Sequence, residues 1–254
     1  MMEPATFGAL FFGMSGIVLP TPKYNFPFEF QNSSRLTYYS SLFNSIEINR
    51  SFYVMPRAKT LSRWYTEVPA TFKFTFKLLK QITHSTGFQF RDSDVMEFMQ
   101  TISNVREKRG CILIQFAASM KIDHADQLER LLSLIQMYNE NNAWHVVIEF
   151  RDNSWYTEGI YDLMNHFSTT IVVHDKPGAP PVNIELKSKI KYLRFHGPRG
   201  DYRGSYDDAI LHEYATYIQE WRETGNLVFV YFNNTNGDAY NNLRKLIYQL
   251  NEGS

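Results

Sequence analysis

Eight short runs of apolar, β-branched and aromatic residues recur along this chain, with longer amphipathic stretches between them. Several runs are apolar almost without interruption, which is typical of parallel strands that are covered on both faces. Eight strand–helix repeats in 254 residues predict an α/β fold, a single closed (β/α)8 TIM-like barrel domain over residues 1–254. The runs are ALFFGMS (9–15), SIEIN (45–49), FKFTFKL (72–78), CILIQF (111–116), HVVIEF (145–150), TIVVHD (170–175), IKYLRFHG (190–197) and LVFVYFNN (227–234).

Helix-capping residues and apolar stripes in the intervals support this alternation. The predicted helices cover residues 32–43, 92–107, 123–141, 207–225 and 238–250. Residues 176–189 are proline-rich and lack a helical pattern, which predicts an irregular crossover there. The competing fold is a doubly wound open sheet, which usually has a glycine-rich phosphate turn after its first strand, and FGMSGIVLP (12–20) matches that turn poorly.

Charge and cysteine content restrict the class of protein. A formal net charge of zero and a pI near 7.1 argue against a sequence-independent nucleic-acid binder, which is normally basic. The single cysteine, Cys111, excludes an internal disulfide framework and fits a reducing compartment, with the thiol in the core. The first apolar stretch is too short for a signal or a membrane span. We therefore expect a cytoplasmic protein that does not enter the membrane.

Polar residues at the ends of the apolar runs point to a functional site. Three runs end with polar residues spaced two apart, a spacing that puts both side chains on one face of a strand. At the C-terminal mouth of a barrel such residues converge on one another and on a ligand. The pairs are Glu47 with Asn49, Glu149 with Arg151, and Arg194 with His196. Further polar residues at run ends are Lys77, His84, Gln115, His174, Asp175, Tyr231 and Asn233.

The chemistry of this set suggests an anion site. Glu47 or Glu149 would act as general base and His196 as general acid. Glycines and arginines in HGPRGDYRGSY (196–206) suit a phosphate, because arginines and free backbone N–H groups bind phosphate oxygens. The residues expected to contact the anion are Lys77, His84, Gln115, Arg151, Arg194, Gly197, Tyr231 and Asn233.

Two alternatives use the same residues differently. The charged residues can form a salt-bridged plug, which is disfavoured because buried charges are costly; we expect instead that Glu149 is open to solvent and ligand. No cofactor is expected, and a divalent metal is the alternative. Lys77, Arg151 and Arg194 would bring positive charge to the carboxylates, which disfavours a cation.

Six phrases along the chain resemble the YecE-like family, the family of unknown function numbered 72. They are EINRSFY (47–53), FKLLKQITH (76–84), EFRDNSW (149–155), RFHG (194–197), YRGSY (202–206) and YFNN (231–234). Their order and spacing match over nearly the whole chain. The resemblance implies a TIM-barrel fold and no settled activity, with a fold-level likeness to metal-dependent endonuclease barrels.

The residues and the resemblance together lead to one leading expectation. The chain binds, and as a hydrolase or lyase acts on, an anionic phosphate-bearing small molecule or nucleic-acid end. The first alternative is a binding module without chemistry, in which Trp155, Tyr202 and Tyr206 stack on bases or sugars. The second is a metal-dependent phosphodiesterase or endonuclease.

Overall fold

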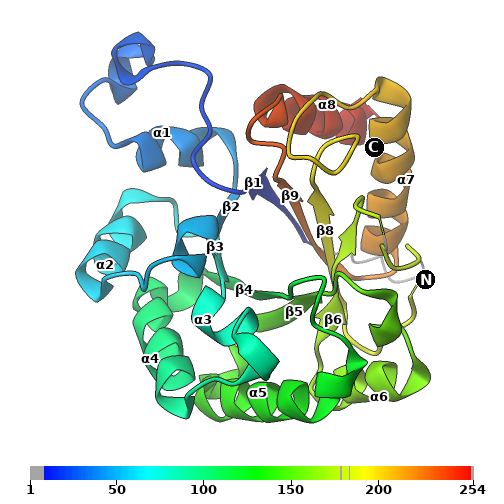
Figure 1. The fold of residues 1–254 in the computed structure, drawn as a ribbon. Helices are drawn as coiled ribbons and strands as arrows, with labels where there is room; N and C mark the ends of the chain where they lie inside the picture. The colour runs from blue at the N-terminus through cyan, green and yellow to red at the C-terminus, as the bar shows by residue number, and fades with distance from the viewer. Residues whose placement is uncertain (1–8, 178, 183, 253–254) are drawn as a thin grey trace, which may run out of the picture.

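Parallel strands form a ring at the centre of the molecule, and helices surround them (Figure 1). The computed structural model describes residues 9–177, 179–182 and 184–252. The strands are β1 (Leu10–Met14), β2 (Ser45–Ile48), β3 (Lys73–Lys77), β4 (Arg109–Gln115), β5 (His145–Glu149), β6 (Thr170–Ile171), β7 (Val173–His174), β8 (Ile190–Phe195) and β9 (Leu227–Phe232). The helices are α1 (Arg35–Leu42), α2 (Ala58–Glu67), α3 (Lys80–Thr83), α4 (Asp92–Ile102), α5 (Ala125–Tyr138), α6 (Glu158–His166), α7 (Asp208–Glu223) and α8 (Ala239–Glu252).

The strands pair in two parallel sheets, in the orders β1-β9-β8-β7 and β2-β3-β4-β5-β6. β6 and β7 are halves of the sixth predicted strand, separated only by Val172. The first half pairs with β5 and the second half pairs with β8. Val172 itself donates its N–H to the carbonyl of Ile148 at 2.8 Å. One continuous segment therefore joins the two sheets on this side of the ring.

The other junction lies between β1 and β2, which are not paired in either sheet. The side chain of Asn44 bridges this gap: it accepts the Phe12 N–H at 2.9 Å and donates to the Leu10 carbonyl at 2.9 Å. A strand ladder that closes the whole ring was expected, and that expectation is wrong here. An amide side chain replaces the missing backbone partner, because a buried N–H or C=O without a partner is costly.

Tyr39 supports the same junction from α1. Its hydroxyl accepts the Met14 N–H at 2.8 Å and donates to the Ser45 carbonyl at 3.0 Å. The two strands approach so closely that a Cβ added at Gly13 would lie 2.0 Å from the Ser45 carbonyl oxygen. Glycine is therefore required at this position of β1.

Most predicted helices are confirmed, and one has a different end. Ser34 caps α1 by accepting the Thr37 N–H at 3.0 Å, and α7 ends before Gly225, whose φ is 78°. The helix expected to reach Glu107 ends at Ile102, and a 3₁₀ segment follows over Ser103–Lys108. The continuation is interrupted because Arg106 has a positive φ of 52°, outside the helical region.

Helices α2, α3 and α6 were not predicted. Between β7 and β8 the described residues contain no helix, which confirms the irregular crossover.

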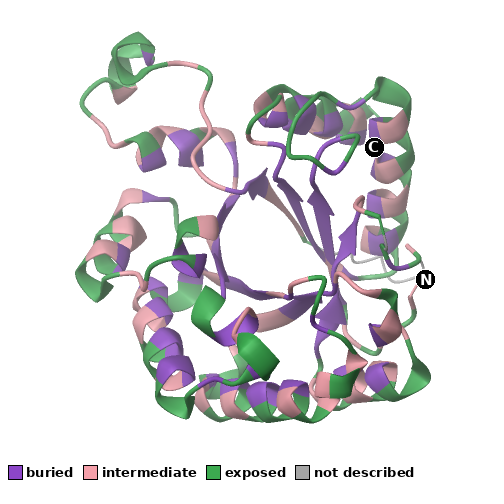
Figure 2. Cartoon of the chain, in the orientation of Figure 1, coloured by how far each residue is buried: buried purple, intermediate pink, exposed green. Residues whose placement is uncertain are grey.

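Two apolar layers hold the barrel together. The larger one lies between the strands and the helices, and the buried faces of the helices turn toward it (Figure 2). The stripe predicted on α5, with Leu128 and Ile135, is buried there. The smaller layer fills the ring and includes Cys111, Tyr192 and Tyr231, so the thiol is in the core as expected. Among the described helices none has the length and apolar character needed to cross a membrane.

Candidate functional site

Arg194 lies at the centre of a polar ring at the carboxyl ends of the strands. Its guanidinium donates to Glu47 Oε1 from Nη2 at 2.8 Å and to Glu149 Oε2 from Nη1 at 2.9 Å. The same Nη2 also reaches the Asn49 amide oxygen at 3.2 Å. Arg194, Glu47 and Glu149 come from β8, β2 and β5, and Asn49 directly follows β2, so the parallel strand ends converge as predicted. Burial by itself disfavours the charged guanidinium, yet the two carboxylates raise the Arg194 pKa above its usual value.

Glu47 is fully satisfied by its neighbours. Besides Arg194, it accepts hydrogen bonds from the hydroxyls of Ser15 and Tyr192, each at 2.5 Å. Burial, and then the charge of Glu47, raise the pKa of Tyr192, so its hydroxyl stays protonated and donates. Ser15 follows β1 and Tyr192 belongs to β8, which places carboxylate, hydroxyl and guanidinium partners from three strands at one point.

Glu149 is a carboxylate held by cations. Its oxygens face Arg194, the Arg151 guanidinium and, at 3.4 Å, the His196 Nε2 atom. Burial alone would raise the pKa of Glu149, but the positive charges of its neighbours, that of Arg194 foremost, outweigh burial and hold the pKa well below the usual value. A carboxylate with so low a pKa is a weak base.

His196 is oriented by contacts at both ring nitrogens. Its Nε2 atom lies 3.1 Å from Arg194 Nη1 and 3.1 Å from Arg151 Nη2, and both guanidinium groups can only donate. Nε2 therefore accepts, and Nδ1 carries the proton that it donates to Asp175 Oδ1 at 3.1 Å. Asp175 also accepts the His196 backbone N–H at 2.8 Å and the Tyr206 hydroxyl. These contacts lock the ring of His196.

Lys77 differs from the other cations of the site. Its amino group donates to Gln115 Oε1 at 2.7 Å and lies 4.0 Å from the centre of the Phe52 ring. Among the described residues Lys77 forms no ion pair. Burial, followed by the positive charge of Arg194, lowers its pKa to about 7. Lys77 is therefore a buried amine that changes its protonation near neutral pH.

The remaining predicted contacts lie around this edge. The Asn49 amide donates to Asn233 Oδ1 at 3.2 Å. His84 packs against Phe52, and its Nδ1 lies 2.9 Å from the Thr83 hydroxyl. Burial, then Lys77, lowers the pKa of His84 to about 4, so at neutral pH this imidazole is uncharged.

The centre of the ring is closed to solvent. Glu47, Glu149 and His196 are 0 % exposed and Arg194 is 1 % exposed. The expectation that Glu149 is open to solvent is therefore wrong. The cause is the convergence of four long side chains, which fill the space that they share. Lys77, which is 9 % exposed, and Arg151, whose side chain is 11 % exposed, lie at the outer edge of the polar ring.

Two residues predicted to contact a ligand have other partners. The Tyr231 hydroxyl contacts the hydroxyls of Ser45 at 2.5 Å and Thr75 at 2.9 Å, and its side chain is buried in the apolar layer inside the ring. The Gly197 N–H donates to the Tyr206 hydroxyl at 2.5 Å, so it is not free for a phosphate. For both residues the sequence predicted the position at a strand end, but it did not predict which partner the hydroxyl or the N–H group would contact.

The aromatic residues expected to stack on a ligand are mostly buried. Trp155 is 0 % exposed, stacks on Phe150 with ring centres 4.7 Å apart, and donates its indole N–H to the Met120 carbonyl. Tyr206 is also buried. Tyr202 is 36 % exposed and remains at the surface. A ring must be exposed to stack on a base or sugar, so this expectation is wrong for Trp155 and Tyr206, whose rings are buried.

Sequence reasoning missed several residues that shape the site. Tyr192 lies two residues before Arg194 on β8, so the same alternation that revealed Arg194 would have revealed it. Ser15 comes directly after the first strand, the position that was used for the other strand ends. Phe52, under the Lys77 amino group, carries no such signal, because an aromatic residue after a strand is ordinarily part of the core.

The donor set does not fit a divalent cation. Within the described ranges there is no cluster of three or more His, Cys, Asp and Glu residues placed to hold a metal ion. The Arg194 guanidinium occupies the space between Glu47 and Glu149. His174 uses both nitrogens on backbone groups, with Nε2 3.1 Å from the Phe150 carbonyl and Nδ1 accepting the Lys176 N–H.

Two bacterial proteins are similar to this chain in sequence. The chain is 25 % identical over 253 residues to the UPF0759 protein YunF of Bacillus subtilis (strain 168), covering 87 % of this chain and 88 % of that protein. It is 29 % identical over 81 residues to the UPF0759 protein YecE of Escherichia coli (strain K12), covering 32 % of this chain and 30 % of that protein.

Two crystal structures of DUF72 family proteins have the same fold. The one from Enterococcus faecalis V583 matches with a TM-score of 0.77 and 19 % identity, over 97 % of this chain and 99 % of that chain. The one from Thermotoga maritima MSB8 matches with a TM-score of 0.75 and 22 % identity, over 96 % of this chain and 99 % of that chain. Residues 12–254 match the model of the family described as "Protein of unknown function DUF72", and the chain belongs to that family.

Proposed function

We propose that this protein binds an anionic, phosphate-bearing small molecule at the C-terminal mouth of its barrel and acts on it by proton transfer. The observation that carries the proposal is the surplus of hydrogen-bond donors on Lys77 and Arg151. Lys77 gives its one hydrogen bond to neutral Gln115. The Arg151 Nε atom is buried and has no hydrogen-bond partner in the described part of the chain. Buried donors without acceptors are costly, and an anion between them would supply the acceptors.

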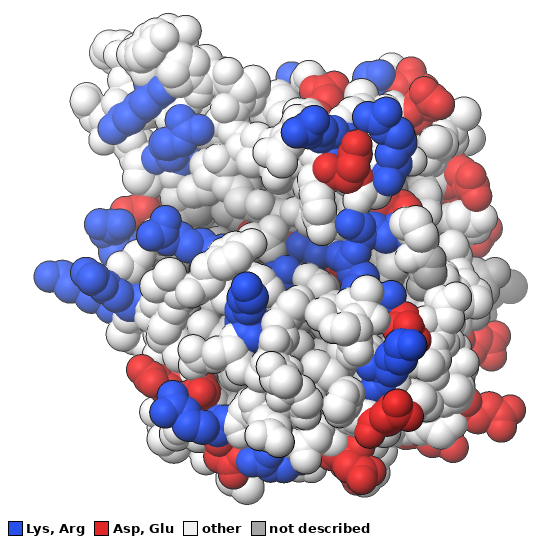
Figure 3. All heavy atoms as spheres, in the orientation of Figure 1, with Lys and Arg blue, Asp and Glu red and all other residues white. Residues whose placement is uncertain are grey.

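The distribution of charge around the ring supports an anionic ligand. Glu47 and Glu149 are the fully buried carboxylates of the ring, and Arg194 lies between them. Lys77 and Arg151 are more exposed than Glu47, Glu149 and Arg194, so a ligand approaching this part of the mouth would meet these two cations before the buried carboxylates. Figure 3 shows Lys and Arg side chains gathered at the centre of the face above the ring of strands. Such a field favours the approach of a negatively charged molecule.

Lys77 is the residue that we assign to proton transfer. An amine with a pKa of about 7 is uncharged in half of the molecules at neutral pH, which suits a group that takes up and returns a proton. Glu149 is the weaker candidate because its pKa is held low. In this proposal Glu47, Glu149 and His196 are positioning residues, which fix the guanidinium groups of Arg194 and Arg151.

The chemistry is then that of a hydrolase or lyase with a phosphorylated substrate. Arg151 holds the phosphate oxygens and stabilises negative charge that develops beside them. Neutral Lys77 accepts a proton from the substrate or from a water molecule next to the phosphate-bearing group, and the resulting ammonium adds to the positive field. No step of this proposal requires a metal.

The second candidate is the binding of a phosphorylated nucleic-acid end without chemistry. The observation that favours it is Tyr202, which is 36 % exposed beside the ring and packs edge-on against His196 with ring centres 5.7 Å apart. A base can stack on an exposed tyrosine next to a phosphate site. Lys176, whose amino group lies 4.3 Å from the centre of the Tyr202 ring, would have to move aside.

The test of the anion site uses sulfate and calorimetric titration on the wild type and two variants. Lys77→Met removes the amine, keeps the aliphatic length and eliminates an unpaired buried charge, so the variant is expected to fold. Loss of one charge-assisted hydrogen bond, about 1.5–3 kcal/mol, should weaken sulfate binding by about tenfold or more. Lys80→Met, at an exposed neighbouring lysine, is the matched control and should leave the affinity unchanged.

Unchanged sulfate affinity in both Lys77→Met and Arg151→Gln would refute the mouth as the anion site. A screen of phosphorylated metabolites then separates enzyme from binder. Turnover in the wild type and its loss in Lys77→Met, with the fold intact, would support the enzyme. Binding of a 5′-phosphorylated oligonucleotide without turnover, weakened by Tyr202→Ala, would support the second candidate.

A further inference from the structure

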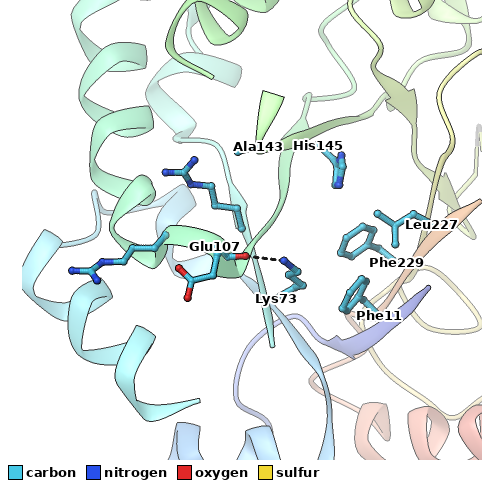
Figure 4. Close-up of a pocket in the computed structure, with 9 residues that line it drawn as sticks. Phe11, Lys73, Glu107, Ala143, His145, Leu227 and Phe229 are labelled. Atoms are coloured by element: carbon cyan, nitrogen blue, oxygen red, sulfur yellow. Dashed lines mark hydrogen bonds between the residues drawn. The ribbon is translucent and has the colours of Figure 1, made fainter. Parts of the chain in front are cut away.

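We propose a second binding site at the opposite, N-terminal end of the barrel, for a small planar aromatic carboxylate. A cavity of about 480 Å³ opens there. It is lined by the first residues of several strands and by the segment before β4 (Figure 4), namely Phe11, Lys73, Arg106, Glu107, Arg109, Ala143, His145, Leu227 and Phe229. The volume falls within the range of small-molecule sites. None of these residues belongs to the polar ring at the mouth.

One side of the cavity is apolar and flat. Phe11 and Phe229, from the neighbouring strands β1 and β9, stack with ring centres 5.1 Å apart and an angle of 21° between the planes. Leu227 lies beside them (Figure 4). Phe11 and Leu227 are only partly buried although they pack on the interior layer of the barrel. Phe229 is buried beneath this surface, so the accessible part of the Phe11 ring is the surface that favours the face or edge of another aromatic ring.

The facing side is cationic. Three of the lining side chains, Lys73, Arg106 and Arg109, are positive, and Glu107 is the one carboxylate among them. Glu107 accepts a hydrogen bond from the hydroxyl of Tyr65 at 2.6 Å. This hydrogen bond is the largest of the causes that lower the pKa of Glu107. Among the described residues its carboxylate is within salt-bridge distance of none of these cations, although the charge of Arg106 acts on it from farther away.

Two donors of this side lack an anionic partner. The Lys73 amino group gives one hydrogen bond, to the backbone carbonyl of Glu107 at 2.8 Å, which Figure 4 marks with a dashed line. The Arg109 Nε atom is buried without a hydrogen-bond partner among the described residues. Burial lowers the pKa of Lys73, and the charge of the nearby Glu107 offsets only part of that effect. A carboxylate would satisfy both groups.

His145 completes the cavity and restricts the type of ligand. Its ring lies 6.1 Å from that of Phe229. Burial, and then the positive charge of Lys73, lower the pKa of His145, so near neutral pH it offers an uncharged N–H group. The cavity thus combines a flat apolar side, a neutral donor and a cationic side. That combination suits a ligand with one carboxylate on an aromatic ring better than a phosphate. A phosphate is strongly hydrated, and contact with the phenyl rings would remove part of its hydration at a cost in free energy.

The backbone of this side is also unusual. Arg106 has φ 52° and ψ −127°, a combination that residues other than glycine rarely adopt. Its guanidinium lies 5.0 Å from the centre of the Tyr65 ring, and Tyr65 in turn holds Glu107. Strained conformations of this kind persist where the surroundings require them, and here the turn places Arg106, Glu107 and Arg109 around one opening.

Benzoate is the probe for the test, with binding measured by calorimetry on the intact chain. Benzoate should bind, while benzyl alcohol, which lacks the charge, and cyclohexanecarboxylate, which lacks the planar ring, should bind at least about tenfold more weakly, a difference of ~1.4 kcal/mol. Lys73→Met should weaken benzoate binding by about tenfold. Phe11→Leu, which keeps an apolar side chain but removes the ring, should weaken benzoate and leave the weaker cyclohexanecarboxylate affinity unchanged.

Controls at the mouth keep the two sites distinguishable. Lys77→Met should leave the benzoate affinity unchanged, and Lys73→Met should leave the sulfate affinity unchanged, which also verifies that the variant is folded. The proposal is overturned if benzoate gives no heat of binding at millimolar concentration. It is equally overturned if Lys77→Met abolishes benzoate binding while Lys73→Met does not, because benzoate would then occupy the mouth.

Discussion

Arg194 donates hydrogen bonds to both Glu47 and Glu149, so a single guanidinium links carboxylates from β2 and β5 across the barrel. All three side chains are buried to 1 % exposure or less. This link explains how two carboxylates are accommodated in an interior position, and why the free cationic donors of the mouth lie on Lys77 and Arg151 instead.

The first prediction concerns Glu149. Glu149→Gln should destabilise the protein by about 3–5 kcal/mol, because it leaves Arg194 and Arg151 with less counter-charge in a site that water does not reach. Denaturant titration measures the loss. Lys245→Gln is the control, since its ion pair with Asp208 is exposed and its loss should change stability little. A loss below about 1 kcal/mol for Glu149→Gln would mean that water enters the ring.

The second prediction is the pH dependence that Lys77 imposes on stability. Its pKa is about 7 in the folded protein and 10.5 for the ordinary side chain. Between these values the unfolded chain holds one more proton than the folded chain, so this group makes stability rise with pH, by up to ~1.4 kcal/mol per pH unit. Below pH 7 both states hold the proton and the cost of the buried charge is fully present.

Lys77→Met should remove this contribution. The unfolding free energy of the variant relative to the wild type should therefore be greatest below pH 7 and fall steadily up to about pH 10.5. Denaturant titrations at pH 6, 8 and 10 measure the difference. A difference that stays constant over this series would show that Lys77 keeps its ordinary pKa.

The third prediction compares two glycines with positive φ. Gly197 has φ 101° and Gly225 has φ 78°, so alanine is strained at both, by about 1–2 kcal/mol. At Gly197 a Cβ would additionally lie 2.3 Å from the Arg203 carbonyl oxygen, whereas at Gly225 no atom lies within 4 Å. Gly197→Ala should thus lower the unfolding free energy by clearly more than Gly225→Ala. Equal losses would show that the loop after β8 relaxes freely.

The fourth prediction tests the junction between β1 and β2. Asn44→Ala removes the partners of the Phe12 N–H and the Leu10 carbonyl, and each unsatisfied group costs about 1–3 kcal/mol. Asn44→Asp keeps an acceptor for the Phe12 N–H and loses the donor to the Leu10 carbonyl. Its loss of stability therefore measures the hydrogen bond to Leu10 separately. Asn241→Ala, at an exposed hydrogen bond to Asp238, should change stability by less than about 0.5 kcal/mol. Chemical denaturation of the three variants checks the order.

Local patterns in the chain are enough to predict the alternation of strands and helices and one polar rim. Side chains two apart on a strand share a face, and parallel strands that end at one side of a barrel bring such faces together. This alternation alone predicts that Glu47, Glu149, Arg194 and His196 converge, and their hydrogen bonds and ion pairs confirm it. The stripe on α5 and the glycine after α7 are predictable for the same reason, since both depend on neighbours within a few residues.

The partners within the rim were decided only by the tertiary structure. Glu47 meets Arg194 across 147 residues of chain, and Ser45 meets Tyr231 across 186. Such pairings depend on strand register and on which side chains fill the shared space. Neither can be inferred from the pattern of neighbouring residues. The same contacts decided that Glu149 is sealed from water, that Trp155 is buried, and that the Gly197 N–H is already bonded. The same contacts explain why Lys77 forms no ion pair with Glu47 or Glu149: both carboxylates are paired with arginines.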